Sequence, residues 1–156
     1  MRRIFLRFGL LSLTTPTNPD ALAKPVELHE LLRSIFGFAR FRANQEAVCR
    51  AAIDGRDLIL IMPTGFGKSL CYQLPAIALG GTALVISPLI ALMEDQAAKL
   101  TALGLRVARI HSGLDRPQAR QACVDYLAGT LQFLFIAPER LRVPGFGEML
   151  PSASRR

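Results

Sequence analysis

One short stretch constrains this chain more than any other, because a glycine-rich turn joins an apolar run to a helical pattern there. The apolar run is 58–61, LILI, and the turn is 62–69, MPTGFGKS. A strand, a glycine-rich loop and a helix in that order build a concave anion site from backbone N–H groups and the positive helix end. The stretch therefore predicts a loop that binds the phosphates of ATP or GTP.

The residues of this phosphate loop, 62–69, have separate expected roles. The small glycines allow the backbone to approach the phosphate oxygens, and Lys68, the candidate catalytic residue, contacts the β- and γ-phosphates as a point charge. The Ser69 hydroxyl is placed to coordinate Mg²⁺. The alternative is a tight strand-to-helix turn with an incidental Lys-Ser pair. The candidate nucleotide-binding residues of the loop are Thr64, Gly65, Phe66, Gly67, Lys68 and Ser69.

Apolar runs and helical patterns alternate along the rest of the chain. Continuous apolar runs favour strands that are buried on both faces of a parallel sheet. Glycines follow the helical patterns, as at Gly37, Gly55, Gly104 and Gly129. We therefore expect an α/β fold made of βαβ units with right-handed crossovers. The expected strands are 58–61, 83–86, 107–110 and 131–136, and the expected helices are about 28–36, 44–54, 69–79, 89–103 and 117–128.

Composition places looser limits on the chain. Its 156 residues allow one domain at most, and 19 Lys plus Arg against 12 Asp plus Glu give a net charge of +7. That excess favours a polyanion such as nucleic acid, although a solvated basic surface would also explain it. Three widely spaced cysteines indicate neither a disulfide framework nor a zinc site, so a reducing, cytoplasmic setting fits best. No apolar run is long enough to span a bilayer.

Proline and polar residues divide the chain into three parts. Residues 1–25 contain Pro16, Pro19 and Pro25 among polar residues, which indicates a flexible N-terminal extension. Residues 26–150 hold the expected strands and helices. Residues 151–156, PSASRR, are expected to be a disordered basic tail.

Four further motifs resemble the RecQ family of superfamily 2 DNA helicases in order and spacing. They are 36–45 (FGFARFRANQ), 70–76 (LCYQLPA), 85–96 (VISPLIALMEDQ) and 136–141 (IAPERL). The resemblance covers roughly residues 28–150. It also accounts for Met62, because loops of this family read Met-Pro-Thr-Gly. Phe66 departs from the family, which more often has a small residue there, so its side chain must point out of the loop.

The resemblance implies that ATP is the nucleotide. Gln45 would read the adenine edge, because an amide donates and accepts at once. Arg42 would support the base or its phosphates, and Phe38 would stack on adenine with its aromatic face. Outside the family context these residues would be a surface glutamine, a solvated charge and a core phenylalanine.

The resemblance also implies that three loops after the strands contact single-stranded or partly duplex DNA. Ser87 and Pro88 read as the N-cap and first residue of a helix, whose free N–H groups suit a phosphate. Each loop also has a purely structural alternative. These are a plain capped helix at Ser87, a hydrogen-bonded turn at His111, and a turn with an exposed ion pair at Glu139 and Arg140. The candidate nucleic-acid-binding residues are Ser87, Pro88, His111, Ser112, Glu139 and Arg140.

One family motif does not occur in the 156 residues, namely the Asp-Glu-Ala-His box that holds Mg²⁺ and positions the attacking water. The second RecA-like domain, which supplies arginines to the transferring phosphoryl group, has no counterpart either. We therefore expect an incomplete RecA-like domain from a 3′→5′ DNA helicase, with little ATPase activity by itself. Two alternatives stay open: a catalytically inactive nucleotide- or DNA-binding remnant, and an unrelated P-loop kinase or transport ATPase. The latter would lack the adenine-reading segment at 38–45.

Overall fold

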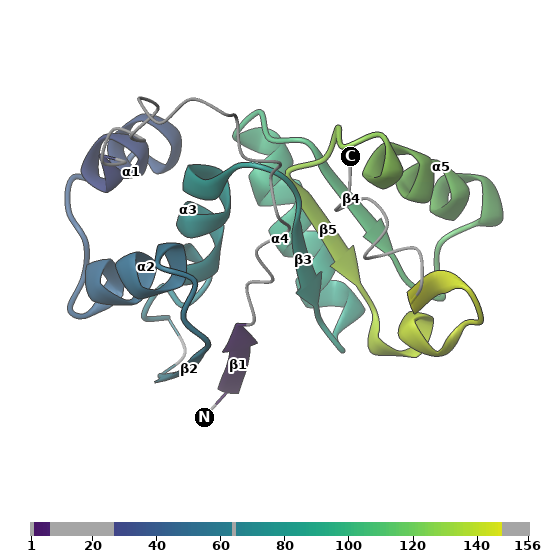
Figure 1. The fold of residues 1–156 in the computed structure, drawn as a ribbon, viewed down its shortest axis with the longest axis horizontal. Coiled ribbons are helices and arrows are strands. Elements are labelled where there is room, and N and C mark those ends of the chain that lie inside the picture. The colour runs from purple at the N-terminus through teal and green to yellow at the C-terminus, as the bar shows by residue number, and fades with distance from the viewer. Residues whose placement is uncertain (1, 7–26, 64, 148–156) are drawn as a thin grey trace, which may run out of the picture. The chain divides into compact units, whose positions relative to one another are not determined.

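The computed structural model describes residues 2–6, 27–63 and 65–147 of the chain. The chain folds into two compact units, with the main boundary between Gly80 and Gly81. We call the part described before that boundary the N-terminal unit and the part after it, residues 81–147, the C-terminal unit. Figure 1 labels the elements of both.

The helices of the N-terminal unit confirm the predicted ranges to within about a residue. Their apolar faces meet in one cluster, which contains Leu28, Leu32, Cys49, Leu70 and Leu74. The first helix ends at Gly37, whose left-handed φ of +70° matches its predicted role as a helix stop. The helices are α1 (Leu28–Phe36), α2 (Gln45–Ile53) and α3 (Leu70–Leu79).

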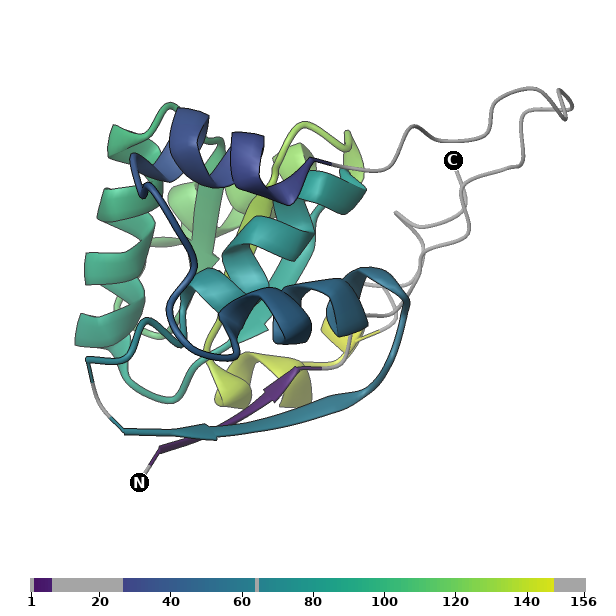
Figure 2. The ribbon, with the colours of Figure 1, turned by 90° about the vertical axis from the view of Figure 1, so that its left-hand side faces the viewer.

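The strand before the phosphate loop, β2 (Leu58–Met62), pairs with a strand that the sequence did not suggest. This partner is β1 (Arg2–Leu6), which runs antiparallel to β2 from Arg2 opposite Met62 to Leu6 opposite Leu58 (Figure 2). Five residues with two arginines at the start of a chain carry no strand signal of their own, and their pairing depends on a segment more than 50 residues away. The rest of the expected extension, residues 1 and 7–25, and the expected tail, 151–156, lie outside the described residues.

The C-terminal unit is a parallel three-stranded sheet with helices beside it (Figure 1). The strands lie in the order β3, β5, β4, so the two crossovers run in opposite directions, and right-handed crossovers then place their helices on opposite faces. This confirms the expected α/β fold, with β2 outside the parallel sheet. The elements are β3 (Ala83–Ile86), α4 (Ile90–Ala102), β4 (Val107–Ile110), α5 (Arg116–Leu127), β5 (Phe133–Ile136) and the 3₁₀ segment η1 (Pro138–Arg142).

The prediction that every apolar strand is buried on both faces holds for β5 and is wrong for β3. Leu134 and Ile136 of the central strand pack with Ile110 against α5. In the parallel register, Leu84 and Ile86 of β3 lie in the same two rows, yet they are 39% and 56% exposed. The cause is position: α5 covers β5 and β4, and β3 lies beyond that cover at the other edge of the sheet. Strand β2 likewise exposes alternate residues.

Ala43 is the one non-glycine residue with positive φ in the described ranges, at +37°. A Cβ makes that region unfavourable, so we expect Ala43→Gly to leave the free energy of unfolding unchanged or raise it by up to about 1 kcal/mol. Ala47, an exposed residue inside α2, is the matched control, because Ala47→Gly should lower stability by about 1 kcal/mol. Urea unfolding of both variants tests this. Equal losses in the two would contradict it.

Candidate nucleotide and nucleic-acid sites

The phosphate loop joins β2 to α3 through two glycines that carry positive φ, Gly65 at +88° and Gly67 at +74°. The backbone N–H groups of residues 65–68 donate to no acceptor among the described residues. Turns of this kind leave N–H groups directed at a common point, which suits an anion. Thr64, the remaining predicted contact of the loop, lies outside the described residues.

The Lys68 ammonium lies over the loop's own backbone. Its Nζ donates to the carbonyl oxygens of Met62 and Pro63, both at 2.7 Å. An ammonium has three donors and strong hydration, so it can exchange carbonyl partners for phosphate oxygens at small cost. The Lys68 ammonium therefore lies at the loop, and its contact with the phosphates stays a prediction.

Gln45 is buried, with 2% of its surface exposed, and its side chain joins α2 to the phosphate loop. Its Oε1 accepts from the backbone N–H of Arg42 at 2.8 Å. Its Nε2 donates to the carbonyl oxygens of Phe66 at 3.3 Å and Gly67 at 3.2 Å. An amide that both accepts and donates is what this position needs. The structure thus brings Arg42, Gln45 and the loop together across more than 20 residues of sequence.

Gly67 has a second reason to be glycine, which the sequence motif alone does not reveal. A Cβ at this position would lie 2.5 Å from Gln45 Nε2, whereas one at Gly65 would meet nothing within 4 Å. The close approach of the Gln45 amide therefore depends on the missing side chain at position 67.

The two phenylalanines of the candidate site are both half exposed, Phe38 at 49% and Phe66 at 50%. An exposed aromatic ring is available to a ligand, and the exposure of Phe66 agrees with the expectation that it leaves the loop. Phe38 follows α1, where its N–H donates to the Leu32 carbonyl. Within the described residues no ring contact connects Phe38 to the loop.

A pair of buried thiols supports the packing of α2 on α3 behind the loop. Cys49 and Cys71 are both fully buried, and the hydrogen bond between them, followed by burial, raises the pKa of the Cys49 thiol far above its ordinary value. Burial likewise raises the pKa of the neighbouring Tyr72 hydroxyl to about 12. The raised pKa values keep Cys49 and Tyr72 protonated, whereas the same hydrogen bond lowers the pKa of the Cys71 thiol. The buried pair packs α2 on α3.

In the C-terminal unit, three predicted segments leave the sheet at the same edge. Ile86, Ile110 and Ile136 are in register, and each is the last residue of its strand. The ladder continues for one more step, because the Ser87 N–H donates to Ile136 and the Ala137 N–H donates to Ile110. We call the following residues, 87–88, 111–112 and 138–140, the carboxyl edge. All six predicted nucleic-acid contacts lie there.

The prediction that Ser87 caps the next helix and Pro88 begins it is wrong. Helix α4 begins at Ile90, after Leu89, with no side-chain cap. The cause is the extra ladder bond, since Ser87 is still paired with Ile136 at 3.1 Å and cannot turn into the helix. Proline at 88 then keeps the preceding residue extended.

The last segment of the carboxyl edge folds as η1. The Arg140 guanidinium carbon lies 6.0 Å from the ring centre of Phe146. Arg140 Nε is buried and has no hydrogen-bond partner among the described residues. In the part of the chain that the structure describes, no ion pair joins Glu139 to Arg140. The alternative interpretation, a turn with an exposed ion pair, is therefore not seen there.

One acidic residue near this edge was not predicted from the sequence to belong to a site. Glu94 of α4 accepts from Arg109 Nε at 2.7 Å and lies 2.9 Å from His111 Nε2. It stands inside the 85–96 motif, but a glutamate in the second turn of a helix is ordinary and the motif assigned it no role. Only the crossover from β3 to β4 places it beside His111.

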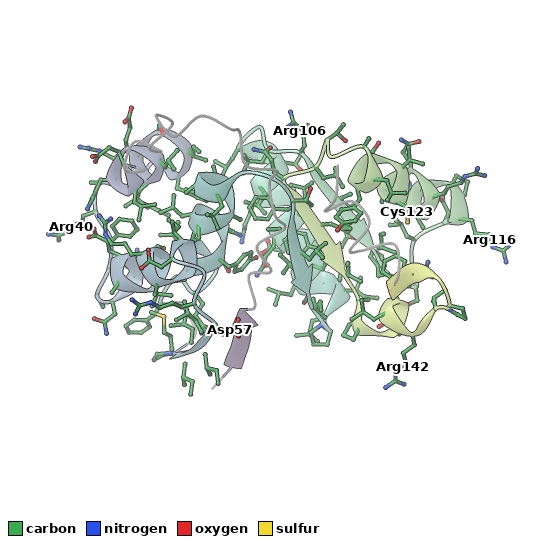
Figure 3. The ribbon with its side chains drawn as sticks, viewed as in Figure 1. Arg40, Asp57, Arg106, Arg116, Cys123 and Arg142 are labelled. Carbon is green, nitrogen blue, oxygen red and sulfur yellow. The ribbon has the colours of Figure 1, made fainter. Side chains whose placement is uncertain are left out.

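The basic residues of the C-terminal unit are not gathered at one surface. Arg106, Arg116 and Arg142 project from different parts of the C-terminal unit (Figure 3). Residues 81–147 contain seven Lys or Arg and five Asp or Glu, a difference of +2 out of the chain's +7. Net charge therefore supports a polyanion partner in general and does not locate it.

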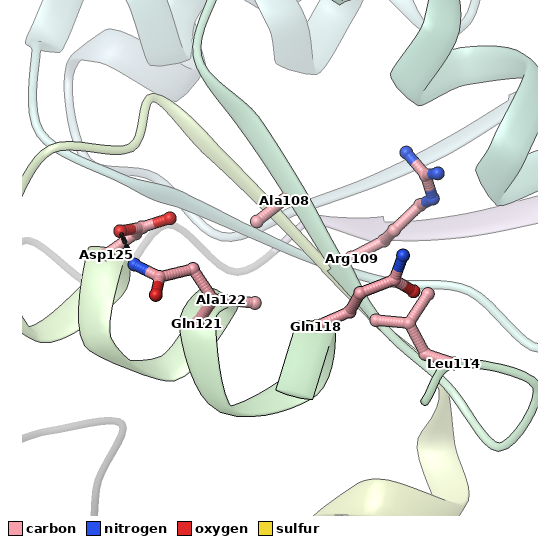
Figure 4. Close-up of a pocket in the computed structure, with 7 residues that line it drawn as sticks. All are labelled: Ala108, Arg109, Leu114, Gln118, Gln121, Ala122 and Asp125. Atoms are coloured by element: carbon pink, nitrogen blue, oxygen red, sulfur yellow. Dashed lines mark hydrogen bonds between the residues drawn. The ribbon is translucent and has the colours of Figure 1, made fainter. Parts of the chain in front are cut away.

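A hollow of about 250 Å³ lies between β4 and α5 (Figure 4). Its wall includes Ala108, Leu114 and Gln118, and a hydrogen bond from Gln121 to Asp125 closes part of it. None of its lining residues belongs to the predicted motifs, so it is separate from the carboxyl edge.

Comparison with known proteins assigns the class. The DEAD/DEAH box helicase family model matches residues 42–145, and the chain belongs to that family. A solved structure described as a hypothetical ATP-dependent RNA helicase from Sulfolobus tokodaii matches with a TM-score of 0.56. It is 22% identical and covers 73% of this chain and 34% of its own, so it shows the fold alone.

Sequence relatives then give the branch, which is the RecQ family. The ATP-dependent DNA helicase RecQ of Haemophilus influenzae is 39% identical over 138 residues, 88% of this chain and 22% of the relative. The probable ATP-dependent DNA helicase RecS of Bacillus subtilis is 42% identical over 127 residues, 81% of this chain and 25% of the relative. The chain thus spans about a fifth to a quarter of these relatives. No described helix is both long and apolar enough to cross a membrane.

The contact between positions 45 and 67 can be tested by a double-mutant cycle. We expect Gly67→Ala to lower the free energy of unfolding by about 2 kcal/mol, because it adds φ strain and displaces the Gln45 amide. In a Gln45→Ala background only the strain is left, so the loss should shrink by about 1 kcal/mol.

Gly65→Ala is the matched control, since it has the same φ strain with open space around its Cβ. Its cost should be equal in both backgrounds. Urea unfolding supplies all six values. An equal cost of Gly67→Ala in the two backgrounds would show that the close approach has no energetic effect.

Proposed function

We propose that this chain binds ATP with Mg²⁺ at the phosphate loop and single-stranded DNA at the carboxyl edge, as the nucleotide-binding part of a RecQ-like 3′→5′ DNA helicase. The observation that carries the proposal is the Gln45 side chain, which links a base-reading position to the loop through hydrogen bonds to residues 66 and 67. Family membership supports the same reading.

The residues at the loop fit ATP and Mg²⁺. The N–H groups of 65–68 supply donors, Lys68 supplies a positive charge at the loop, and Ser69 stands immediately before α3, where its hydroxyl would hold the metal. When bound, Mg²⁺ neutralises charge on the phosphate oxygens. Lys68 would exchange the carbonyls of Met62 and Pro63 for phosphate oxygens.

Adenine recognition follows from the chemistry of the amide. The Gln45 amide accepts from the Arg42 N–H and donates to the carbonyls of Phe66 and Gly67, so to read a base it would exchange these partners for the base edge. Its acceptor and donor would then match the N6 and N7 atoms of adenine and mismatch the N7 and O6 acceptors of guanine. The exposed ring of Phe38 supplies a stacking surface. The side chain of Arg42, in the same segment of the chain, is also exposed. This favours ATP over GTP, which separates the proposal from a general P-loop kinase or transport ATPase.

Support for DNA at the carboxyl edge comes from its polar and basic groups. The exposed Ser112 and the half-buried Arg140 offer donors to phosphate oxygens. The buried Arg140 Nε–H has no acceptor among the described residues, which costs about 1–3 kcal/mol and favours a rearrangement that gives the guanidinium an oxygen partner. We propose phosphate as that partner.

Calorimetric titration of the 156-residue chain with nucleotide and Mg²⁺ tests the first half. We expect saturable ATP binding that is at least about tenfold tighter than GTP binding, since a mismatched polar edge costs more than 1 kcal/mol. Lys68→Ala should weaken the binding of both nucleotides. Gln45→Ala should remove the preference for ATP, whereas the exposed control Gln118→Ala should keep it. A preference that survives in Gln45→Ala would exclude adenine reading by this residue.

Turnover is a separate property. Because the 156 residues hold no Asp-Glu-Ala-His sequence, we expect this chain by itself to bind ATP without hydrolysing it. The loss of an arginine finger alone lowers the rate by about 10³ to 10⁵ in related enzymes. Steady-state hydrolysis should equal that of a Lys68→Ala control, and a rate clearly above that control would contradict the expectation.

A further inference from the structure

The side chain of Glu94 holds two groups of the neighbouring strand and loop. One carboxylate oxygen, Oε1, lies 2.7 Å from Arg109 Nε and 2.9 Å from His111 Nε2. Glu94 belongs to α4, Arg109 to β4, and His111 is the first residue after that strand. A single carboxylate thus ties the helix to the point where the chain leaves the sheet.

The hydrogen bonds assign the tautomer of His111. Its Nδ1 accepts from the backbone N–H of Gly113 at 3.2 Å, so this nitrogen carries the lone pair. The proton is then on Nε2, which donates to Glu94. Both ring nitrogens are used, and the ring is only 5% exposed.

This placement limits what His111 can do. To touch a DNA phosphate, the ring would have to break both hydrogen bonds and leave a buried position. Its geometry instead fixes the backbone, because the ring bridges α4 and the N–H of Gly113. A Cβ at Gly113 would lie 3.3 Å from His111 Nδ1, so a side chain there would make the ring shift by a few tenths of an ångström.

We propose that Glu94 is a positioning residue, which acts through His111 to hold residues 111–113 at the carboxyl edge in the conformation that receives single-stranded DNA. The predicted contact role of His111 becomes one of support, and the exposed Ser112 and the backbone beside it make the contact. The same carboxylate neutralises Arg109, which is therefore not the group that attracts the phosphate. This inference rests on the proposed binding of DNA at this edge.

The proposal and a simple charge argument predict opposite changes in DNA affinity when Glu94 is replaced. Removing a negative charge should strengthen binding to a polyanion, and Glu94→Ala would also release Arg109. If Glu94 positions the loop, Glu94→Ala should instead weaken binding, by about 3- to 10-fold, the effect of one or two hydrogen bonds. Glu94→Gln keeps an acceptor for His111 and should recover most of that loss.

The experiment measures the Kd of the 156-residue chain for a fluorescent oligothymidylate at one salt concentration. Asp95→Ala is the matched control, because Asp95 is the next residue on α4, carries the same charge and pairs only with the exposed Lys99 at 2.7 Å among the described residues. The ¹⁵N resonances of His111 give an independent readout: the Nε2 shift should stay near its wild-type position in Glu94→Gln and move in Glu94→Ala, which removes the acceptor of the Nε2–H. Urea unfolding confirms that each variant is folded.

The outcomes separate the two proposals. Weaker binding in Glu94→Ala, with recovery in Glu94→Gln and a displaced His111 Nε2 shift in Glu94→Ala alone, supports positioning. If the wild type binds and Glu94→Ala binds as tightly as Asp95→Ala, or more tightly, the positioning role is overturned and DNA binding stands. If the wild-type chain shows no saturable binding, the DNA proposal itself fails, and positioning fails with it.

Discussion

The contact on which the nucleotide site depends is the hydrogen bonding of the Gln45 amide to the phosphate loop. A loop with two positive-φ glycines is not held by helix or sheet, so its shape needs support from elsewhere. Gln45 gives that support to the carbonyls of residues 66 and 67 and is itself fixed by the N–H of Arg42. The helices beneath are held by the cluster that includes Cys49 and Leu74. In the proposed function, this one side chain would couple base reading to phosphate binding.

The two sheets show how strand position decides burial. Strand β5 lies between two neighbours and between two helices, and all four of its side chains are buried. Strand β3 has similar apolar residues at the outside of the same sheet and exposes every second one. In the N-terminal unit, β1 pairs with β2 along five residues and gives the loop's strand a partner. Apolar content alone therefore indicates a strand but does not determine which of its faces are buried.

Much of the fold followed from local signals. Glycines mark the ends of α1 and α4, and apolar runs mark the strands, so these elements were predictable to within a few residues. What depends on distant partners was not: the pairing of β1, the ladder bond that keeps Ser87 from capping α4, and the meeting of Glu94 with His111. Motif spacing found the residues of both candidate sites. It could not show that Gln45 lies on Gly67, because that contact spans 22 residues.

The central claim is that the loop and Gln45 form one nucleotide site. The most direct test is a two-dimensional ¹⁵N NMR titration of the 156-residue chain with ATP and Mg²⁺, following the backbone amides of 65–68 and the Gln45 side-chain NH₂. Saturable, simultaneous shifts of both sets with ATP, and a smaller shift of the Gln45 amide with GTP, are the predicted result. Loop amides that do not shift with ATP, or a Gln45 amide that responds equally to both nucleotides, would contradict it.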